Sequence, residues 1–238
     1  MGHRQGHKDM RFSIIVGTYN QAQYMPKLIE SLDNQTFKDF EVLFCDDGSD
    51  DGTIEVIESL PVSFEYRIFT QPQKGMRLAK SVNQGIKAAR GEHCVFIMGD
   101  SFPELNYLEL LDEWCGDDNI VCGIRVHVED KKIIEMDYRL RKGIIPKEPV
   151  LLPVKPWELM TGNGLAIPTE AMRLYGGWDE DISGYGGEDQ EIIGRLYYKG
   201  YLCWSVPQLL LYHHYHYNKA SSEKNREIAG TKLHGYAQ

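Results

Sequence analysis

Three short apolar segments, each followed at once by polar side chains, constrain the fold more than any other feature of this sequence. Runs of this length are typical of strands buried in a parallel sheet. They are FSIIVG at residues 12–17, EVLFC at residues 41–45 and HCVFIM at residues 93–98. A helical pattern over residues 22–32 separates the first two, and strand, helix, strand at this spacing implies parallel pairing with a right-handed crossover. The sequence therefore predicts an α/β fold, with a mostly parallel sheet flanked by helices.

The polar residues after these runs are candidates for ligand binding, because ligands of open α/β sheets collect beyond the carboxyl ends of the strands. Asp46 and Asp47 begin the stretch DDGSDDGT. A carboxylate at this position could accept the N3–H of a uracil, whereas it would repel a phosphate. A turn that caps the next helix is the alternative, with Asp51 or Thr53 as the cap. The other two runs end in Thr18, Tyr19, Asn20, Met98, Gly99 and Asp100.

Residues 74–92 follow a third, weaker strand at residues 64–69, and their apolar spacing predicts a helix. Lys74, Gly75 and Arg77 stand at its beginning. Main-chain amides and a guanidinium at a helix start can bind a diphosphate. A solvated basic face is the alternative at this position.

A glycine-rich loop that leads into an acidic helix start lies at residues 176–200, GGWDEDISGYGGEDQEIIGRLYYKG. The glycines permit a tight bend and a close approach to a ligand. Apolar spacing after Glu188 predicts a helix, so that Glu188 and Asp189 would sit at the positive end of its dipole. Helix capping alone is the alternative. Trp178 and Tyr185 flank the acids on a loop too rich in glycine to be core, and aromatic faces beside paired carboxylates suit a sugar.

The second half of the chain shows weaker patterns. They predict a helix at residues 105–114, a strand with an exposed face at 120–128, a hairpin and loops at 131–156, and a last strand at 201–206. Histidines follow at positions 213, 214 and 216, where a histidine-rich strand end in solvent is the alternative to a metal site. The polar tail from Lys219 onward could fold over the site or stay mobile.

The composition limits which classes of protein this chain can belong to. With 238 residues, 42% hydrophobic and 26% charged, we expect one soluble domain over residues 1–238. The net charge of −9 argues against nucleic acid or an anionic membrane as the main partner. No apolar run approaches the ~20 residues of a transmembrane segment, and the first ten residues lack the apolar core of a signal peptide, so a cytoplasmic location is expected. Cys45 and Cys94 are expected to be buried free thiols.

Two of these stretches resemble motifs of family 2 glycosyltransferases and of their galactosyl- and N-acetylgalactosaminyltransferase relatives. DDGSDDGT resembles the xDDGSxDGT of that family, and residues 176–191 resemble GGxDExFxGWGGEDxE. The second match departs at Ile182 and Tyr185, where the relatives prefer Phe and Trp. Together with the first strand end and the histidines, the resemblance covers residues 12–216.

The resemblance implies a glycosyltransferase-A-like fold, in which residues 10–102 bind a nucleotide sugar and residues 103–238 build the acceptor site. The nucleotide-binding residues that it implies are Thr18, Tyr19, Asn20, Asp46, Asp47, Lys74, Gly75, Arg77, Met98, Gly99 and Asp100. Those implied for the acceptor or the donor sugar are Asn163, Gly164, Trp178, Tyr185 and Gly187.

The family's metal-binding Asp-x-Asp motif corresponds to Met98-Gly99-Asp100, so only its second Asp is present. In the galactosyltransferase relatives that second Asp is a metal ligand, and a histidine at the spacing of His213 is another. The resemblance therefore implies a divalent cation on Asp100 and His213. Mn²⁺ is expected in preference to Mg²⁺, because it accepts an imidazole ligand more readily.

The implied reaction is an inverting transfer of a sugar from a nucleotide sugar, UDP-linked in our expectation, to a hydroxyl of a glycan or other acceptor. Asp189 corresponds to the family's catalytic base, and Glu188 is expected to orient one of the sugars. A sugar-nucleotide or glycan-binding module without catalytic activity is an alternative suggested by Met98. A nucleotidyltransferase is less favoured, because no glycine-rich loop follows the first strand.

Overall fold

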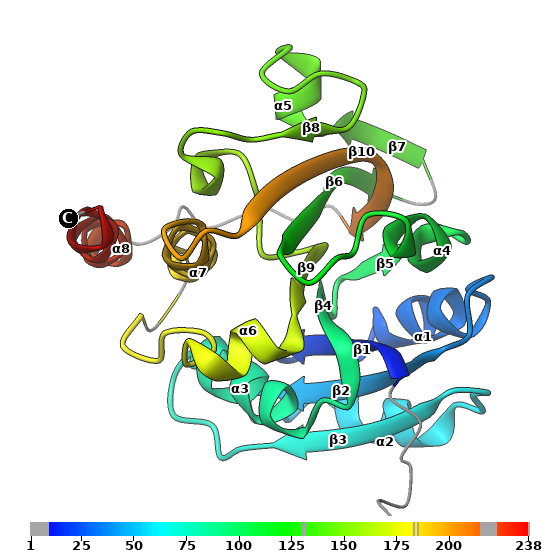
Figure 1. The fold of residues 1–238 in the computed structure, drawn as a ribbon. Helices are drawn as coiled ribbons and strands as arrows, with labels where there is room; N and C mark the ends of the chain where they lie inside the picture. Colours follow the sequence, from blue (N-terminus) through cyan, green and yellow to red (C-terminus); the bar gives the residue numbers. More distant parts are fainter. Residues whose placement is uncertain (1–9, 130–131, 183, 185, 215–222, 238) are drawn as a thin grey trace, which may run out of the picture.

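The computed structural model describes residues 10–129, 132–182, 184, 186–214 and 223–237. The strands within them are β1 (Met10–Thr18), β2 (Phe40–Asp46), β3 (Glu65–Thr70), β4 (Gly91–Met98), β5 (Ser101–Pro103), β6 (Asn119–Glu129), β7 (Lys132–Met136), β8 (Val150–Leu151), β9 (Leu165–Pro168) and β10 (Leu202–His214). These described strands form one sheet with the order β3-β2-β1-β4-β9-β6-β10-β5 (Figure 1). β7 pairs with β6, and β8 pairs with β10.

The first half of the sheet is parallel, as the sequence predicts. β1 pairs in parallel with β2 and β4, and β2 pairs in parallel with β3. Alternate side chains enter opposite cores, so that Ile15 faces one and Ile14 the other. Cys45 and Cys94 are buried free thiols, which confirms that expectation. Because parallel strands share a direction, all their polar ends lie at one edge.

The second half of the sheet is mixed, with β6 and β10 paired in parallel. β9 runs antiparallel to both β4 and β6. β6 lies between β9 and β10 and is buried over most of its length, so the predicted exposed face is wrong. β10 continues past Pro207 to His214, because the register shifts between Ser205 and Leu210 and an irregular strand can include a proline there.

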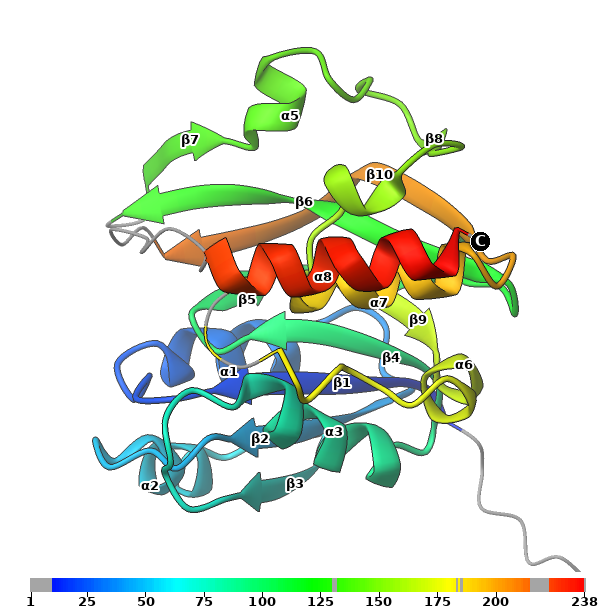
Figure 2. The same cartoon turned by 90° about the vertical axis from the view of Figure 1, so that its left-hand side faces the viewer.

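Helices cover both faces of the sheet (Figures 1 and 2). Their bounds are α1 (Met25–Asp33), α2 (Thr53–Ser59), α3 (Leu78–Ala88), α4 (Tyr107–Asp112), α5 (Tyr138–Arg141), α6 (Thr169–Leu174), α7 (Glu188–Tyr197) and α8 (Glu223–Tyr236), with a 3₁₀ turn at Pro156–Glu158. Apolar side chains of α3, α6 and α7 pack on one face, and those of α1, α2 and α4 pack on the other.

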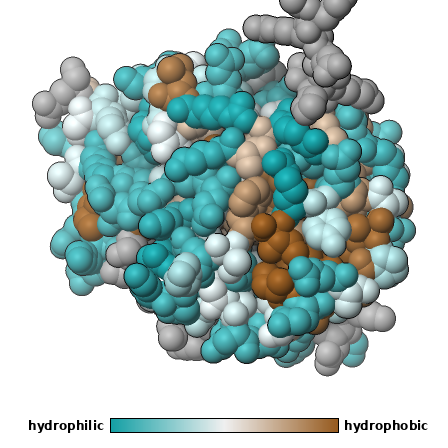
Figure 3. All heavy atoms as spheres, turned by 90° about the horizontal axis from the view of Figure 1, so that it is seen from below, coloured by the Kyte–Doolittle hydropathy of each residue, from teal (hydrophilic) through white to brown (hydrophobic). Residues whose placement is uncertain are grey.

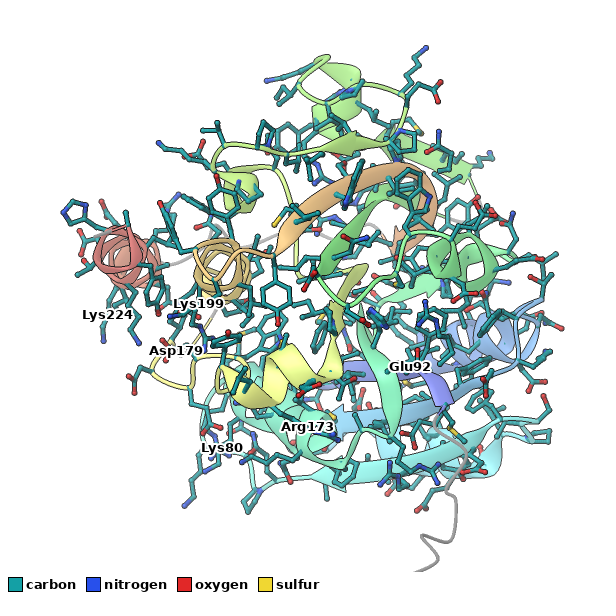
Figure 4. The ribbon with its side chains drawn as sticks, viewed as in Figure 1. Lys80, Glu92, Arg173, Asp179, Lys199 and Lys224 are labelled. Atoms are coloured by element: carbon teal, nitrogen blue, oxygen red, sulfur yellow. The ribbon has the colours of Figure 1, made fainter. Side chains whose placement is uncertain are left out.

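The polar tail forms α8, which lies along α7 (Figure 2). Leu233 occupies the space over Gly194, where a Cβ would lie only 1.9 Å from its Cδ2. Tyr236 Oη donates to Glu191 Oε1 at 2.5 Å. Lys232 pairs with Asp179, labelled in Figure 4, on the loop before α7. The tail thus supports the helix that begins with the predicted catalytic acids.

The surface beside the edge strand β3 is largely hydrophilic, with one concentrated apolar area (Figure 3). Among the helices in the described part of the chain, none combines the length and the apolar character needed to cross a membrane.

Candidate functional site

A pocket of about 660 Å³ opens at the carboxyl edge of the parallel strands. Thr18 ends β1, Asp47 follows β2 and Asp100 follows β4, and all three line it. Glu188 and Asp189, at the start of α7, line the same pocket. The fold therefore brings residues from both halves of the chain to one cavity, at the place where open α/β sheets bind ligands.

Asp46 holds its own loop and does not line the pocket. Its carboxylate accepts hydrogen bonds from Gly48 N at 2.9 Å, Ser49 N at 3.0 Å and Thr70 Oγ1 at 3.0 Å. The structure therefore gives Asp46 the turn-forming role that was the alternative for this stretch, in place of a direct ligand contact.

Asp47 faces the pocket, and two donors fix its carboxylate. Gln71 Nε2 donates to Oδ1 at 2.6 Å, and Arg77 N donates to Oδ2 at 2.5 Å. At the neighbouring strand end Tyr19 also lines the pocket, whereas Asn20 turns toward the loop after β2 and donates through Nδ2 to Asp50 Oδ1 at 2.8 Å.

The predicted basic cluster does not reach the pocket. α3 begins at Leu78, later than the expected residue 74, because Gly75 has a φ of 82° that no helix contains. The Arg77 guanidinium donates to the carbonyl of Pro72 instead of facing the cavity. Lys74, Gly75 and Arg77 are all absent from the pocket lining.

Glu188 and Asp189 form a half-buried carboxylate pair. Asp189 accepts hydrogen bonds from Gly162 N at 3.1 Å and from Gln190 N at 2.9 Å. Burial and, second, the charge of Asp189 raise the pKa of Glu188 to about 7. Burial also raises the pKa of Asp189. Because the two groups interact, they titrate as a pair, and such a pair in a cleft can exchange a proton near neutral pH.

Two glycines make this arrangement possible. At Gly162 a Cβ would lie 2.7 Å from the Trp178 ring and 3.0 Å from Asp189 Cβ, so a side chain would displace the amide that binds Asp189. Gly187 caps α7 with a φ of 97°, in the left-handed region that favours glycine. Both glycines line the pocket.

Trp178 belongs to the core, which corrects the expectation that its loop lies outside. It is 2% exposed and its ring lies 5.3 Å from that of Phe96. Asn83 holds its main chain, donating to Trp178 O at 2.8 Å and accepting from Trp178 N at 2.9 Å. Trp178 still contributes to the pocket lining, so it forms part of the pocket wall. Tyr185 lies outside the described residues.

Asn163 lines the pocket and ties it to the end of β4. Its Oδ1 accepts from Met98 N at 3.1 Å, and its Nδ2 donates to Ser101 Oγ at 2.8 Å. Met98 also lines the pocket, whereas Gly99 and Gly164 do not.

Asp100 and His213 meet in the pocket, although they are far apart in sequence. Asp100 Oδ2 lies 3.4 Å from His213 Nε2, and both residues are buried. A carboxylate oxygen and an imidazole nitrogen this close suit a cation such as Mn²⁺. Across the described residues no group of three or more metal-ligating side chains occurs, so this pair would need further oxygens from a bound ligand. His216 lies outside those residues.

A second histidine, His127, touches His213. Their Nδ1 atoms are 3.2 Å apart. Burial, and then electrostatic interactions with His213 and Arg125, lower the pKa of His127. His214 points away from this pair, as the alternation of side chains along a strand predicts, and stacks on Tyr24 with ring centroids 4.6 Å apart.

Other pocket residues carried no recognisable signal in the sequence. They include Gln21, Gln73, Met76, Arg125 and Arg226. Arg125 lies on β6, and only the strand pattern around it could have suggested its position. Arg226 lies on α8, whose apolar residues are too few to predict how the tail packs.

Several buried polar atoms at this pocket have no hydrogen-bond partner within the described part of the chain. They are Thr18 Oγ1, Gln21 Oε1, Arg125 Nε, Trp178 Nε1 and Glu188 Oε2. Buried polar groups nearly always have partners. These atoms leave the pocket able to hydrogen-bond a polar ligand.

Solved structures share this fold. TarS from S. aureus, in complex with UDP, superposes with a TM-score of 0.76 at 17% identity, covering 95% of this chain and 65% of that one. The mannosyltransferase PcManGT from Pyrobaculum calidifontis, in complex with GDP-Man and Mn²⁺, has a TM-score of 0.69 at 18% identity, covering 97% of this chain and 65% of that one. These likenesses confirm the glycosyltransferase-A type of fold.

Sequence relatives point to one family. Chondroitin synthase from Escherichia coli is 25% identical over 84% of this chain and 34% of its own length. Cholesterol galactosyltransferase from Borreliella burgdorferi is 36% identical over 47% of this chain and 32% of its own length. The chain thus spans about a third of each of these relatives. The family sequence model for glycosyl transferase family 2 matches residues 13–163, which is more than half of the 238 residues. The chain therefore belongs to glycosyl transferase family 2.

Proposed function

We propose that this chain transfers a sugar from a nucleotide sugar, UDP-linked, to a hydroxyl of a glycan or similar acceptor, with inversion at the anomeric carbon. One observation carries the proposal: the half-buried Asp189 carboxylate faces the same pocket as Asp47 and the Asp100–His213 pair. Solved relatives in complex with UDP and with UDP-GlcNAc support the choice of donor. The resemblance of residues 176–191 to the galactosyltransferase motif supports the role of Asp189.

In this proposal the nucleotide lies at the ends of β1 and β2. Asp47 has a fixed carboxylate, which accepts the N3–H of the uracil, and Thr18 and Tyr19 line the cavity beside it. Asn163 and the wall formed by Trp178 face the sugars. The unsatisfied Oε2 of Glu188 accepts a hydroxyl hydrogen and so orients one of them.

Asp189 takes the proton from the acceptor hydroxyl as its oxygen bonds to the anomeric carbon and the bond from that carbon to UDP breaks. The amides of Gly162 and Gln190 hold the carboxylate in place for this step. Asp100 and His213 would hold a divalent cation. When bound, that cation supplies positive charge to offset the charge that develops on the leaving diphosphate.

The function is tested by a donor screen followed by a transfer assay. Purified protein is heated with each of several UDP- and GDP-sugars, with Mn²⁺ or with EDTA. A donor at a hundred times its dissociation constant stabilises the fold by about 2.7 kcal/mol, a readily measured shift in the unfolding temperature. The stabilising donor is then incubated with hydroxyl acceptors. Binding without transfer would favour the inactive module, and pyrophosphate release from UTP and a sugar phosphate would favour a nucleotidyltransferase.

Asp47 and Asp46 form a matched pair for the nucleotide pocket. Asp47→Ala should weaken UDP binding by about 1–3 kcal/mol, because the buried base N–H loses its acceptor. Asp46→Ala should mainly lower the unfolding temperature and have a smaller effect on UDP affinity than Asp47→Ala, because its carboxylate holds the loop. Calorimetric titration with UDP and thermal unfolding of both variants measure the two effects. Unchanged UDP affinity in Asp47→Ala would remove this residue from the nucleotide site.

The carboxylate pair should give the reaction an acid limb near neutral pH. Since the pKa of Glu188 is raised to about 7, kcat/KM should fall as pH drops below that value and the pair takes up a proton. Glu188→Gln removes one ionisable group and its negative charge, so the acid limb should move to lower pH. Profiles of kcat/KM from pH 5 to 9 compare the two proteins. An acid limb that stays in place in Glu188→Gln would show that this pair does not control the rate.

A further inference from the structure

His127 and His213 occupy directly paired positions on the neighbouring parallel strands β6 and β10. Their Nδ1 atoms lie 3.2 Å apart, and their rings are nearly perpendicular, with an interplanar angle of 87°. Both strands are also hydrogen-bonded on their other sides. β6 pairs with β7 and β9, and β10 pairs with β5. The contact between the two imidazoles is therefore set by the sheet and not by a mobile loop.

A hydrogen bond between two Nδ1 atoms restricts where the protons lie. One of the nitrogens must carry the hydrogen and the other must accept it, because two lone pairs at this distance would repel each other. The other ring nitrogen of His213, Nε2, points at Asp100 and lies 3.4 Å from its Oδ2. An imidazole nitrogen must be unprotonated to bind a metal ion. A cation shared by Asp100 and His213 therefore requires that His213 keep its hydrogen on Nδ1.

We propose that His127 is a positioning residue for the metal ligand: its Nδ1 accepts the Nδ1–H of His213, which directs the Nε2 lone pair of His213 toward the cation shared with Asp100. This inference rests on the metal site of the proposed function. Metal-binding histidines commonly donate their second nitrogen to a carboxylate or a carbonyl group. Here an imidazole from the next strand takes that place.

Without a metal, the protons of His213 would be placed the other way round. His213 Nε2–H would then donate to Asp100, and His213 Nδ1 would accept from His127. His127 must therefore supply a hydrogen-bond acceptor when the metal is bound and a hydrogen-bond donor when it is absent. The metal-bound state therefore needs an acceptor at the position of Nδ1, and the side chain of Asn can offer its Oδ1 there whereas that of Phe cannot.

The test measures Mn²⁺ binding directly, by electron paramagnetic resonance of free Mn²⁺ at saturating UDP. His127→Phe keeps an aromatic ring but removes the acceptor, and Mn²⁺ affinity should fall by about 10- to 100-fold. His127→Asn should retain an affinity near that of the wild type. His214→Phe is the matched control, since that ring stacks on Tyr24 on the other side of the same strand, and it should leave Mn²⁺ affinity unchanged. UDP affinity in EDTA should be the same in all variants.

Wild-type Mn²⁺ affinity in His127→Phe would overturn the inference. Equal losses in His127→Phe and His127→Asn, together with equally lowered unfolding temperatures, would also overturn it, because they would assign His127 a packing role only. The metal site itself is checked separately with Asp100→Ala and His213→Ala. If those two variants bind Mn²⁺ like the wild type, the metal part of the proposed function fails and the role of His127 fails with it.

Discussion

Replacing Asp189 by Asn should abolish most sugar transfer while leaving UDP affinity nearly intact. The base acts on the acceptor hydroxyl and not on the nucleotide, so only the chemical step loses its proton acceptor. Loss of general-base catalysis predicts a fall in kcat of roughly 10²- to 10⁴-fold. Gly162 N donates to Oδ2 of Asp189 and Gln190 N donates to Oδ1, so asparagine keeps an acceptor for only one of these amides. Thermal unfolding of the variant checks that the local fold is preserved.

Steady-state turnover at saturating acceptor, together with calorimetric titration of UDP, measures both parts of this expectation. Asp118→Asn makes the same chemical change at an exposed position in the turn before β6 and serves as the control. If Asp189→Asn kept more than a tenth of the wild-type turnover, Asp189 would not be the base. Its neighbour Glu188 would then be the candidate.

Removing the metal should have the second large effect, a loss of UDP affinity. Asp100 and His213 are only two protein ligands, so the cation needs diphosphate oxygens to complete its coordination. Metal and UDP should therefore bind cooperatively, each raising the affinity of the other by the same factor, typically about 5- to 150-fold. EDTA should lower the UDP affinity of the wild type by that factor. Mn²⁺ should be more effective than Mg²⁺, because the set includes an imidazole.

The variants Asp100→Ala and His213→Ala should bind UDP equally well with Mn²⁺ and with EDTA, at the level of the wild type in EDTA. Titrations of UDP against the three proteins under both conditions decide the matter. UDP affinity that does not change with metal in the wild type would show that the cation site was lost together with the first Asp of the motif, where Met98 now stands.

The parts of the fold that follow from local sequence were predictable. Short apolar runs give β1, β2 and β4, and the carboxyl-edge rule then places Thr18, Asp47 and Asp100 together. The acidic start of α7 was also evident, because the glycines before Glu188 and the apolar spacing after it are both local signals.

The parts that depend on distant partners were not predictable. The burial of β6 depends on β9 and β10 lying on either side of it, and no residue of β6 carries that information. Trp178 is a core residue because Asn83, far away in sequence, holds its main chain. The pairing of Asp100 with His213 was expected only through the family resemblance, since spacing alone does not define a metal site.

The pairing of strands across the two halves of the chain limits how this protein can be recombined with other family members. β4, from the first half of the chain, is hydrogen-bonded to β9, and β5 is hydrogen-bonded to β10 near its end. A chimera that joined the first 103 residues of one family member to the rest of another would therefore have to match two strand pairings in register, β4 with β9 and β5 with β10. A mismatch in either pairing would displace Asp100 or His213, so donor and acceptor preferences are better exchanged through single loops than through whole halves.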